Sequence, residues 1–241
     1  ARDAVRKPWQ AAVAVAPAAR RRASEGLTDG PHRLRPSSCP TGCGEDPHES
    51  LSSLLGMAGS VSNVTMIKLY DYLPSGNSYK IRLLLTRLAI PFERIELDFD
   101  AGETRSAEFL ARNPTGRIPL VELEDGTYLS ESGAILYYFG QNSAFFPDAP
   151  LPRAQVLQWM FFEQYEHEPN IAVARHWLSH GPIDDERRQA LAEKQTRGSA
   201  VLAQMDRNLS DRQWFVGETC SIADIALYAY THVAPEGGFE L

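Results

Sequence analysis

The sequence predicts an α/β segment with the element order βαβαββα, followed by an all-helical segment. Three observations predict this order. A strand pattern, a helical pattern and a second strand pattern follow one another from residue 66 onward. The dipeptide Asp125-Gly126, a strong hairpin signal, joins two further strand patterns. After a proline-rich connector at residues 145–152, only helical periodicity is left.

The first three elements are predicted to form a βαβ unit. Residues 66–72 alternate apolar and polar side chains, as a strand does. A turn at residues 73–77 leads into a helix that ends at Ile90-Pro91. The apolar face of this helix follows the spacing i, i+3, i+4 and i+7, at Ile81, Leu84, Leu85 and Leu88. Alternation over residues 95–100 predicts the second strand, parallel to the first.

The remainder of the α/β segment contains two helices and a hairpin. Residues 106–112 are predicted to be helical, and Asn113-Pro114 ends that helix. Residues 118–124 form a strand pattern, and residues 127–129 return antiparallel to it. The next helix is indicated by the spacing of Ser132, Ile135, Leu136 and Phe139.

Three helical stretches make up the second segment. Residues 153–178 are helical in pattern, and Pro169 is expected to kink or break that stretch. Residues 184–209 form a second long helix, with either Asp184 or Asp185 as its cap.

The third helix is predicted to open at Ser221-Ile222-Ala223-Asp224, a capping box with Asp in place of Glu. We interpret this motif as structural, because it fixes a core helix and carries no obvious chemistry. The neighbouring Cys220 is expected to be a small core residue.

Composition excludes several classes of protein. The chain has 241 residues and a net charge of −7, which argues against nucleic-acid binding. It has no run of about 18 apolar residues, so no membrane span is predicted. Its cysteines, Cys39, Cys43 and Cys220, are too few for a disulfide framework and indicate a reducing compartment, the cytoplasm.

Residues 1–63 are predicted to be a disordered or non-native leader. Residues 1–60 contain one aromatic residue, Trp9, and carry a charge of +2, against −9 for the rest of the chain. The run Arg20-Arg21-Arg22 faintly suggests a transit peptide instead. The pair Cys39-x3-Cys43 with His48 lacks a fourth ligand, so no metal site is predicted.

From about Met66 the chain resembles cytosolic-type, bacterial-like glutathione transferases. Each motif is weak alone, but their order and separations are specific. The motifs are Leu69-Tyr70-Asp71-Tyr72-Leu73-Pro74-Ser75-Gly76-Asn77, Asn113-Pro114-Thr115-Gly116-Arg117-Ile118-Pro119, Glu131-Ser132 and Ser221-Ile222-Ala223-Asp224. The resemblance implies a thioredoxin-like domain at residues 64–143 and an all-helical domain at residues 152–241.

The same resemblance implies an activity and partners. The protein is expected to be a homodimer that conjugates glutathione, its co-substrate, to small electrophiles in detoxification. Family members usually carry further helix after the capping-box helix, so the helical domain is expected to be incomplete. Apolar surface is then expected to be uncovered at Ile225, Leu227 and Tyr228.

The resemblance implies a serine-type active site. Ser75 aligns with the residue that stabilises the glutathione thiolate, and Asn77 is placed to assist or replace it. Considered alone, a serine before a helix is most often an N-cap. Tyr70 and Tyr72 are assigned structural roles on the first strand.

The remaining glutathione contacts are also implied by the resemblance. Ile118-Pro119 is expected to be a cis peptide whose backbone meets the cysteinyl part of glutathione. Arg117 either binds the glycyl carboxylate or is an ordinary solvated arginine. Glu131 and Ser132 are expected to hold the γ-glutamyl end, although both residues also suit the first turn of a helix.

The acceptor site is expected between the domains, with Arg175 the best candidate and Tyr165 the next. His167, His176 and Trp177 are weaker candidates on the same helical stretch, because aromatic residues at helical spacing are more often core. Two alternatives stay open: another glutathione enzyme (disulfide reductase, peroxidase, dehalogenase or isomerase), or a non-catalytic protein-association module. The first helix has no Cys-x-x-Cys, so the reactive thiol is expected to be that of glutathione.

Overall fold

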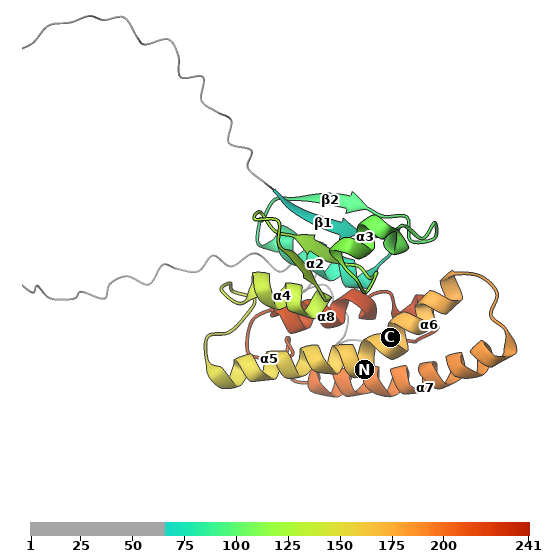
Figure 1. Ribbon diagram of the computed structural model, residues 1–241. Helices are drawn as coiled ribbons and strands as arrows, with labels where there is room; N and C mark the ends of the chain where they lie inside the picture. The colour runs from blue at the N-terminus through green and yellow to red at the C-terminus, as the bar shows by residue number, and fades with distance from the viewer. Residues whose placement is uncertain (1–65) are drawn as a thin grey trace, which may run out of the picture. The chain divides into compact units, whose positions relative to one another are not determined.

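The computed structural model describes residues 66–241 (Figure 1). The expected leader at residues 1–63, with Cys39, Cys43 and His48, lies outside the described residues. The α/β half contains β1 (Ile67–Asp71), α2 (Gly76–Arg87), β2 (Phe92–Glu96), η1 (Glu103–Arg105), α3 (Ala107–Arg112), β3 (Leu120–Glu122), β4 (Tyr128–Ser130) and α4 (Ser132–Gly140). The helical half contains α5 (Pro150–Phe162), η2 (Glu163–His167), α6 (Glu168–Ser179), α7 (Asp185–Asn208), α8 (Ile222–Thr231) and η3 (Ala234–Gly237).

The four strands form one sheet in the order β2-β1-β3-β4. The pair β1–β2 is parallel, and the pairs β1–β3 and β3–β4 are antiparallel. Leu69 of β1 lies opposite Val121 of β3, and neither side chain is exposed to solvent. The predicted order βαβαββα is confirmed, as is the thioredoxin-like and all-helical fold class.

The second strand was predicted too far along the chain. β2 ends at Glu96 because the chain then turns: Ala101 N donates to Asp98 Oδ1 at 2.8 Å. Phe99 therefore leaves the sheet with 41% of its surface exposed. Side-chain alternation persists through such a turn, so the pattern alone does not mark the end of the strand.

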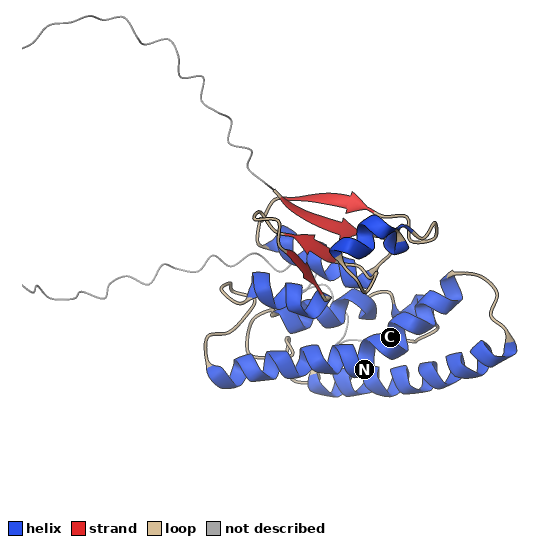
Figure 2. Cartoon of the chain, in the orientation of Figure 1, coloured by secondary structure: helices blue, strands red, loops and turns tan. Residues whose placement is uncertain are grey.

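Every described element after β4 is helical (Figure 2). The first long helix is not broken at Pro169, which was expected to kink or break it: the backbone stays helical from α5 through the π-helical segment η2 into α6, and Pro169 is the second residue of α6. Asp184 caps α7, since Arg187 N donates to Asp184 Oδ1 at 2.8 Å. α5 already begins at Pro150, so the connector is shorter than expected. Among residues 66–241, no helix has the length and apolar character needed to cross a membrane.

Helix α8 lies in the core that both halves share. It packs against α2 and α4 of the α/β half and against α5 and α6 of the helical half (Figure 1). The expected capping box is present, and Ser221 N donates to Asp224 Oδ2 at 2.8 Å. The expectation of uncovered apolar surface was wrong: Ile225, Leu227 and Tyr228 are at most 8% exposed, because these neighbours enclose the helix.

Candidate functional site

Ser75 lies at the end of the loop after β1, directly before the start of α2. Ser75 N donates to Tyr72 O at 2.8 Å, and Ser75 Oγ accepts from Ser78 N at 3.2 Å as the helix N-cap. Two residues later, Asn77 N donates to the Tyr230 hydroxyl at 3.2 Å. Because the Ser75 hydroxyl uses only its oxygen in capping, its hydrogen is left for a second partner.

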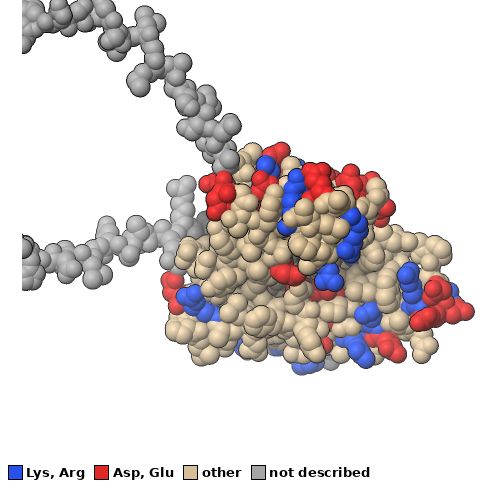
Figure 3. All heavy atoms as spheres, in the orientation of Figure 1, with Lys and Arg blue, Asp and Glu red and all other residues tan. Residues whose placement is uncertain are grey.

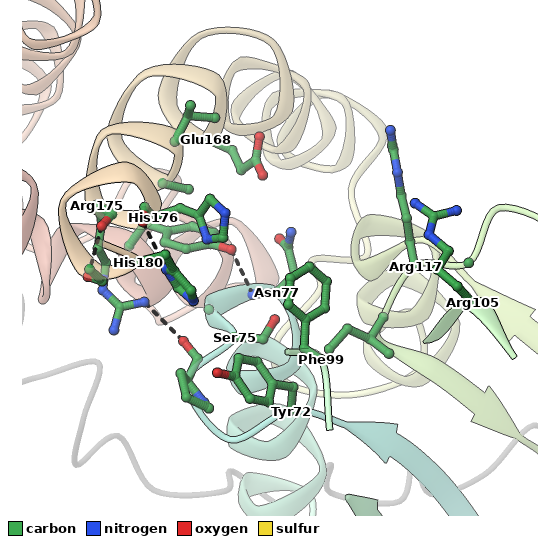
Figure 4. A pocket seen from close by; sticks show the side chains of 18 residues that line it. Tyr72, Ser75, Asn77, Phe99, Arg105, Arg117, Glu168, Arg175, His176 and His180 are labelled. Carbon is green, nitrogen blue, oxygen red and sulfur yellow. Dashed lines mark hydrogen bonds between the residues drawn. The ribbon is translucent and has the colours of Figure 1, made fainter. Parts of the chain in front are cut away.

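Two cavities meet at this helix start. The first has a volume of about 380 Å³ and lies between the start of α2, the loop at Phe99 and helix α6 (Figure 4). The second has a volume of about 540 Å³ and lies beside α4. Asn77, Arg117 and Ile118 line both cavities. Volumes of this size accommodate small organic ligands.

The structure brings the expected glutathione residues together around these cavities. Ser75 lines the first cavity, and the other residues line the second, namely Asn77, Arg117, Ile118, Pro119, Glu131 and Ser132. The Ile118-Pro119 bond is cis, as expected. Asn113 secures the preceding loop, because its Nδ2 donates to Arg117 O at 2.7 Å.

Glu131 has an unusual backbone conformation at the entrance to α4. Its φ is +68°, in the left-handed region that non-glycine residues seldom adopt. Such a conformation costs on the order of 1–3 kcal/mol and is found mainly at ligand sites. Glu131 is exposed at the second cavity, whereas Ser132, the first residue of α4, is only 4% exposed.

A buried ion pair behind the cavities was missed from the sequence. Lys80 Nζ lies 2.8 Å from Glu163 Oε1, and the two side chains are 1% and 3% exposed. A signal was available, because Lys80 precedes the buried Leu84 by one helical turn and therefore shares its face. Burial raises the pKa of Glu163, and the charge of Lys80 opposes that shift.

One wall of the first cavity is aromatic. The Tyr72 ring lies 5.7 Å from Phe99, and His176 meets Phe99 edge to face at 6.3 Å. Burial, with a contribution from His180, lowers the pKa of His176. Tyr72 was expected to be a structural residue on the first strand, but it follows β1 and lines this cavity (Figure 4). Tyr70 is structural as expected, with its hydroxyl 2.8 Å from Glu122 Oε2.

The two expected acceptor residues lie in different surroundings. Arg175 lines the first cavity; its Nη1 donates to Pro74 O at 3.0 Å, and its Nε to Glu236 Oε2 at 2.6 Å. Tyr165 is 81% exposed and lines neither cavity, so the structure does not bring it to the site.

Of the other residues considered from the sequence, His167 and Cys220 lie inside the protein, whereas His176 lines the first cavity and Trp177 is only partly buried. His167 is buried against Thr231, and burial lowers its pKa to about 3. Cys220 is a buried free thiol, as expected of a core residue. Among residues 66–241, no cluster of three metal-ligating side chains is found.

Comparison with known proteins gives consistent matches. The family description "Glutathione S-transferase, N-terminal domain" matches residues 65–141, and "Glutathione S-transferase, C-terminal domain" matches residues 170–240. The chain is similar to the structure of a glutathione S-transferase from Pseudomonas fluorescens, with 51% identity and a TM-score of 0.71, over 73% of this chain and 88% of that one.

Two further similarities bear on function. A glutathione transferase from Pseudomonas putida, with one glutathione disulfide bound per subunit, is 27% identical with a TM-score of 0.63, over 72% of this chain and 77% of that one. The curated "Protein URE2" of Meyerozyma guilliermondii is 28% identical over 72% of this chain and 70% of its own length.

Proposed function

Because the chain belongs to the glutathione S-transferase family, we propose that it binds glutathione, ionises the thiol and directs the thiolate at a small electrophile. One observation carries this proposal. Ser75 and Asn77, at the first turn of α2, line the same cavity system as Arg117, Glu131 and Ser132.

The start of α2 supplies what a thiolate requires. A free thiol ionises near pH 8.5, so donors that favour the anion are needed at neutral pH. The Ser75 hydroxyl donates its hydrogen to the sulfur while its oxygen caps the helix. The partial positive charge of the helix N-terminus acts in the same direction. Asn77 adds an amide donor from the same first turn of α2.

The ends of the tripeptide match the second cavity. Glu131 and the N-terminus of α4 at Ser132 suit the ammonium and carboxylate of the γ-glutamyl group. Arg117, which is exposed and lines both cavities, suits the glycyl carboxylate. The backbone of cis Ile118-Pro119 suits the cysteinyl unit between these ends.

The first cavity is the proposed acceptor site. Its wall of Tyr72, Phe99 and His176 favours flat, aromatic or conjugated electrophiles. Arg175 sits at this site as well, where it also holds the Pro74 carbonyl next to Ser75. The proposed acceptors are therefore neutral or anionic, because a second cation would meet the guanidinium.

A second candidate reaction is the reduction of glutathione mixed disulfides. It is favoured by the Pseudomonas putida relative that holds glutathione disulfide. In this reaction the thiolate of one glutathione attacks the glutathionyl sulfur of a mixed disulfide, forms glutathione disulfide and releases the other thiolate. Among residues 66–241 the free cysteine is Cys220, which is buried and lines neither cavity, so the reacting sulfurs are proposed to be those of the substrates.

Binding calorimetry and the ultraviolet absorbance of bound thiolate test the proposal. Ser75→Ala is expected to raise the thiol pKa of bound glutathione and to slow conjugation of an aryl halide. Ser106→Ala is the matched control, because Ser106 Oγ caps α3 with the same 3.2 Å bond, far from Ser75 in sequence and outside both cavities. A wild-type protein that neither binds glutathione nor conjugates the halide would contradict the proposal and leave the non-catalytic association module as the alternative.

We also propose a homodimer in the cytoplasm. Phe161 and Tyr165 lie one turn apart and are 69% and 81% exposed, which is unusual for such large side chains. On the face shown in Figure 3, the surface around α5 carries few charged side chains. We propose that a second copy of the chain packs against this surface. The free thiol of Cys220 fits a reducing compartment.

A further inference from the structure

The buried pair Lys80–Glu163 lies directly behind the proposed thiolate site. Lys80 comes from α2, whereas Glu163 opens the π-helical segment η2 of the helical half. Burying two charges is costly unless each is fully satisfied by its surroundings. The hydrogen bonds of Lys80 show how its charge is satisfied, and one of them holds the side chain of Asn77.

All three ammonium hydrogens of Lys80 have acceptors. Nζ donates to Glu163 Oε1 at 2.8 Å, to Asn77 Oδ1 at 2.8 Å and to Ser132 Oγ at 3.4 Å. Ser132 Oγ in turn lies 3.3 Å from Asn77 Oδ1, to which it donates. The Asn77 oxygen therefore receives two hydrogen bonds from behind the site.

These contacts determine the orientation of the Asn77 amide. In the flipped orientation, the NH₂ group would face the Lys80 ammonium, and two donors would meet without an acceptor. The oxygen is thus turned towards Lys80, and the NH₂ group is turned away from it. Asn77 lines both cavities, and Figure 4 shows its amide among the side chains around the first one.

We propose that Lys80, anchored by Glu163, is a positioning residue that fixes the Asn77 amide as a hydrogen-bond donor to the glutathione sulfur. This inference rests on the proposed glutathione chemistry. Lys80 does not touch the sulfur and acts through Asn77. Other groups near the pair are Glu168, whose charge acts on Glu163, His167, whose Nδ1 is 4.0 Å from Glu163 Oε1, and Tyr230, whose ring centre is 5.6 Å from Lys80 Nζ.

The test measures the thiol pKa of bound glutathione by absorbance titration of the full chain. The key variant replaces both charges, Lys80→Met with Glu163→Leu, because a buried pair exchanged for apolar side chains usually leaves the protein folded. We expect the thiol pKa of bound glutathione to rise by about one unit, so the ratio of thiolate to thiol at a given pH falls about tenfold. Lys68→Met is the control, since Lys68 forms a 2.8 Å pair with Glu122 outside both cavities.

A second arm asks whether Lys80 acts through Asn77. Asn77→Ala is expected to lower the thiolate fraction to a similar extent, and adding it to the paired variant is expected to cause little further loss. A paired variant with the wild-type thiol pKa, or fully additive losses, overturns the positioning role alone. A wild-type protein that binds glutathione with an unshifted thiol pKa overturns both this inference and the proposed function.

Discussion

The ring of Tyr230 lies so close to the backbone of Gly76 that a Cβ at position 76 would overlap the ring atom Cε1. The Tyr230 hydroxyl also accepts from Asn77 N at 3.2 Å. Tyr230 belongs to α8 and is buried, so this helix sets the position of the first turn of α2. The position of the proposed thiolate donors thus depends on a contact with the helical half.

Gly76→Ala is predicted to disturb this contact. The added methyl group must displace either Tyr230 or the start of α2, because the ring is held in the core. We expect the free energy of unfolding to fall by about 1–3 kcal/mol and glutathione affinity to fall with it. Urea denaturation and calorimetry measure the two effects. Gly133→Ala is the control: its Cβ would meet only Met160 Cε at 3.8 Å, so equal losses in both variants would contradict the steric explanation.

Asp224→Ala is predicted to destabilise the protein without altering the chemistry. Asp224 is fully buried and accepts from Phe215 N at 3.0 Å and Ser221 N at 2.8 Å. Its removal leaves buried donors unsatisfied, at a cost of about 3 kcal/mol or more. Thermal unfolding is the measurement. Asp125→Ala removes an exposed turn bond to Thr127 N and is expected to cost less than about 1 kcal/mol.

His167 is predicted to make stability fall in acid. Burial lowers its pKa to about 3 from the ordinary 6.5, so below pH 6.5 the unfolded chain binds a proton that the folded protein excludes. The stabilising contribution is complete above pH 6.5 and is lost as the pH falls towards 3. Between pH 7.5 and 5.5, wild-type protein should lose about 1.4 kcal/mol more than His167→Gln, as measured by urea denaturation. Parallel curves for the two proteins would argue against this assignment.

Phe161→Glu is predicted to separate the proposed dimer. A carboxylate at this exposed position would be desolvated in any apolar interface. Analytical ultracentrifugation is expected to show the molecular mass halved, with glutathione still bound. Leu178→Glu is the comparison, because Leu178 is also exposed, at 44%, but lies on α6. A wild-type monomer would show that the apolar surface has another use.

The order of elements was predictable because each element carries its own periodicity. Asp125-Gly126 likewise acts locally, through a tight turn, and it acts as expected. The end of β2 was not predictable, since the Asp98 turn does not interrupt the alternation of side chains. Local signals therefore predict the order of the elements better than the residues at which each element ends.

The residues of the candidate site also differ in whether local sequence signals predict them. Residues within short motifs, such as Ser75 and Glu131, were predicted because those motifs resemble the ones of the family, and both residues line the cavities. The bond from Lys80 to Glu163 spans 83 positions, and only the packing of η2 beside α2 brings the two residues together. Tyr230 reaches the first cavity in the same way, on a helix of the second half. No local pattern encodes such partnerships.

Lys80 and Glu163 lie in different halves of the protein, so a change at one position is expected to require a matching change at the other. A crossover that replaced one half with that of a relative lacking the matching charge would leave a lone ion inside the protein, at a cost of about 3–5 kcal/mol. Domains have only about 5–15 kcal/mol of stability in total. Recombinants are therefore expected to fold when the residues at positions 80 and 163 come from the same parent. The pair thus limits which N-terminal and C-terminal halves of related proteins can be combined to give new specificities.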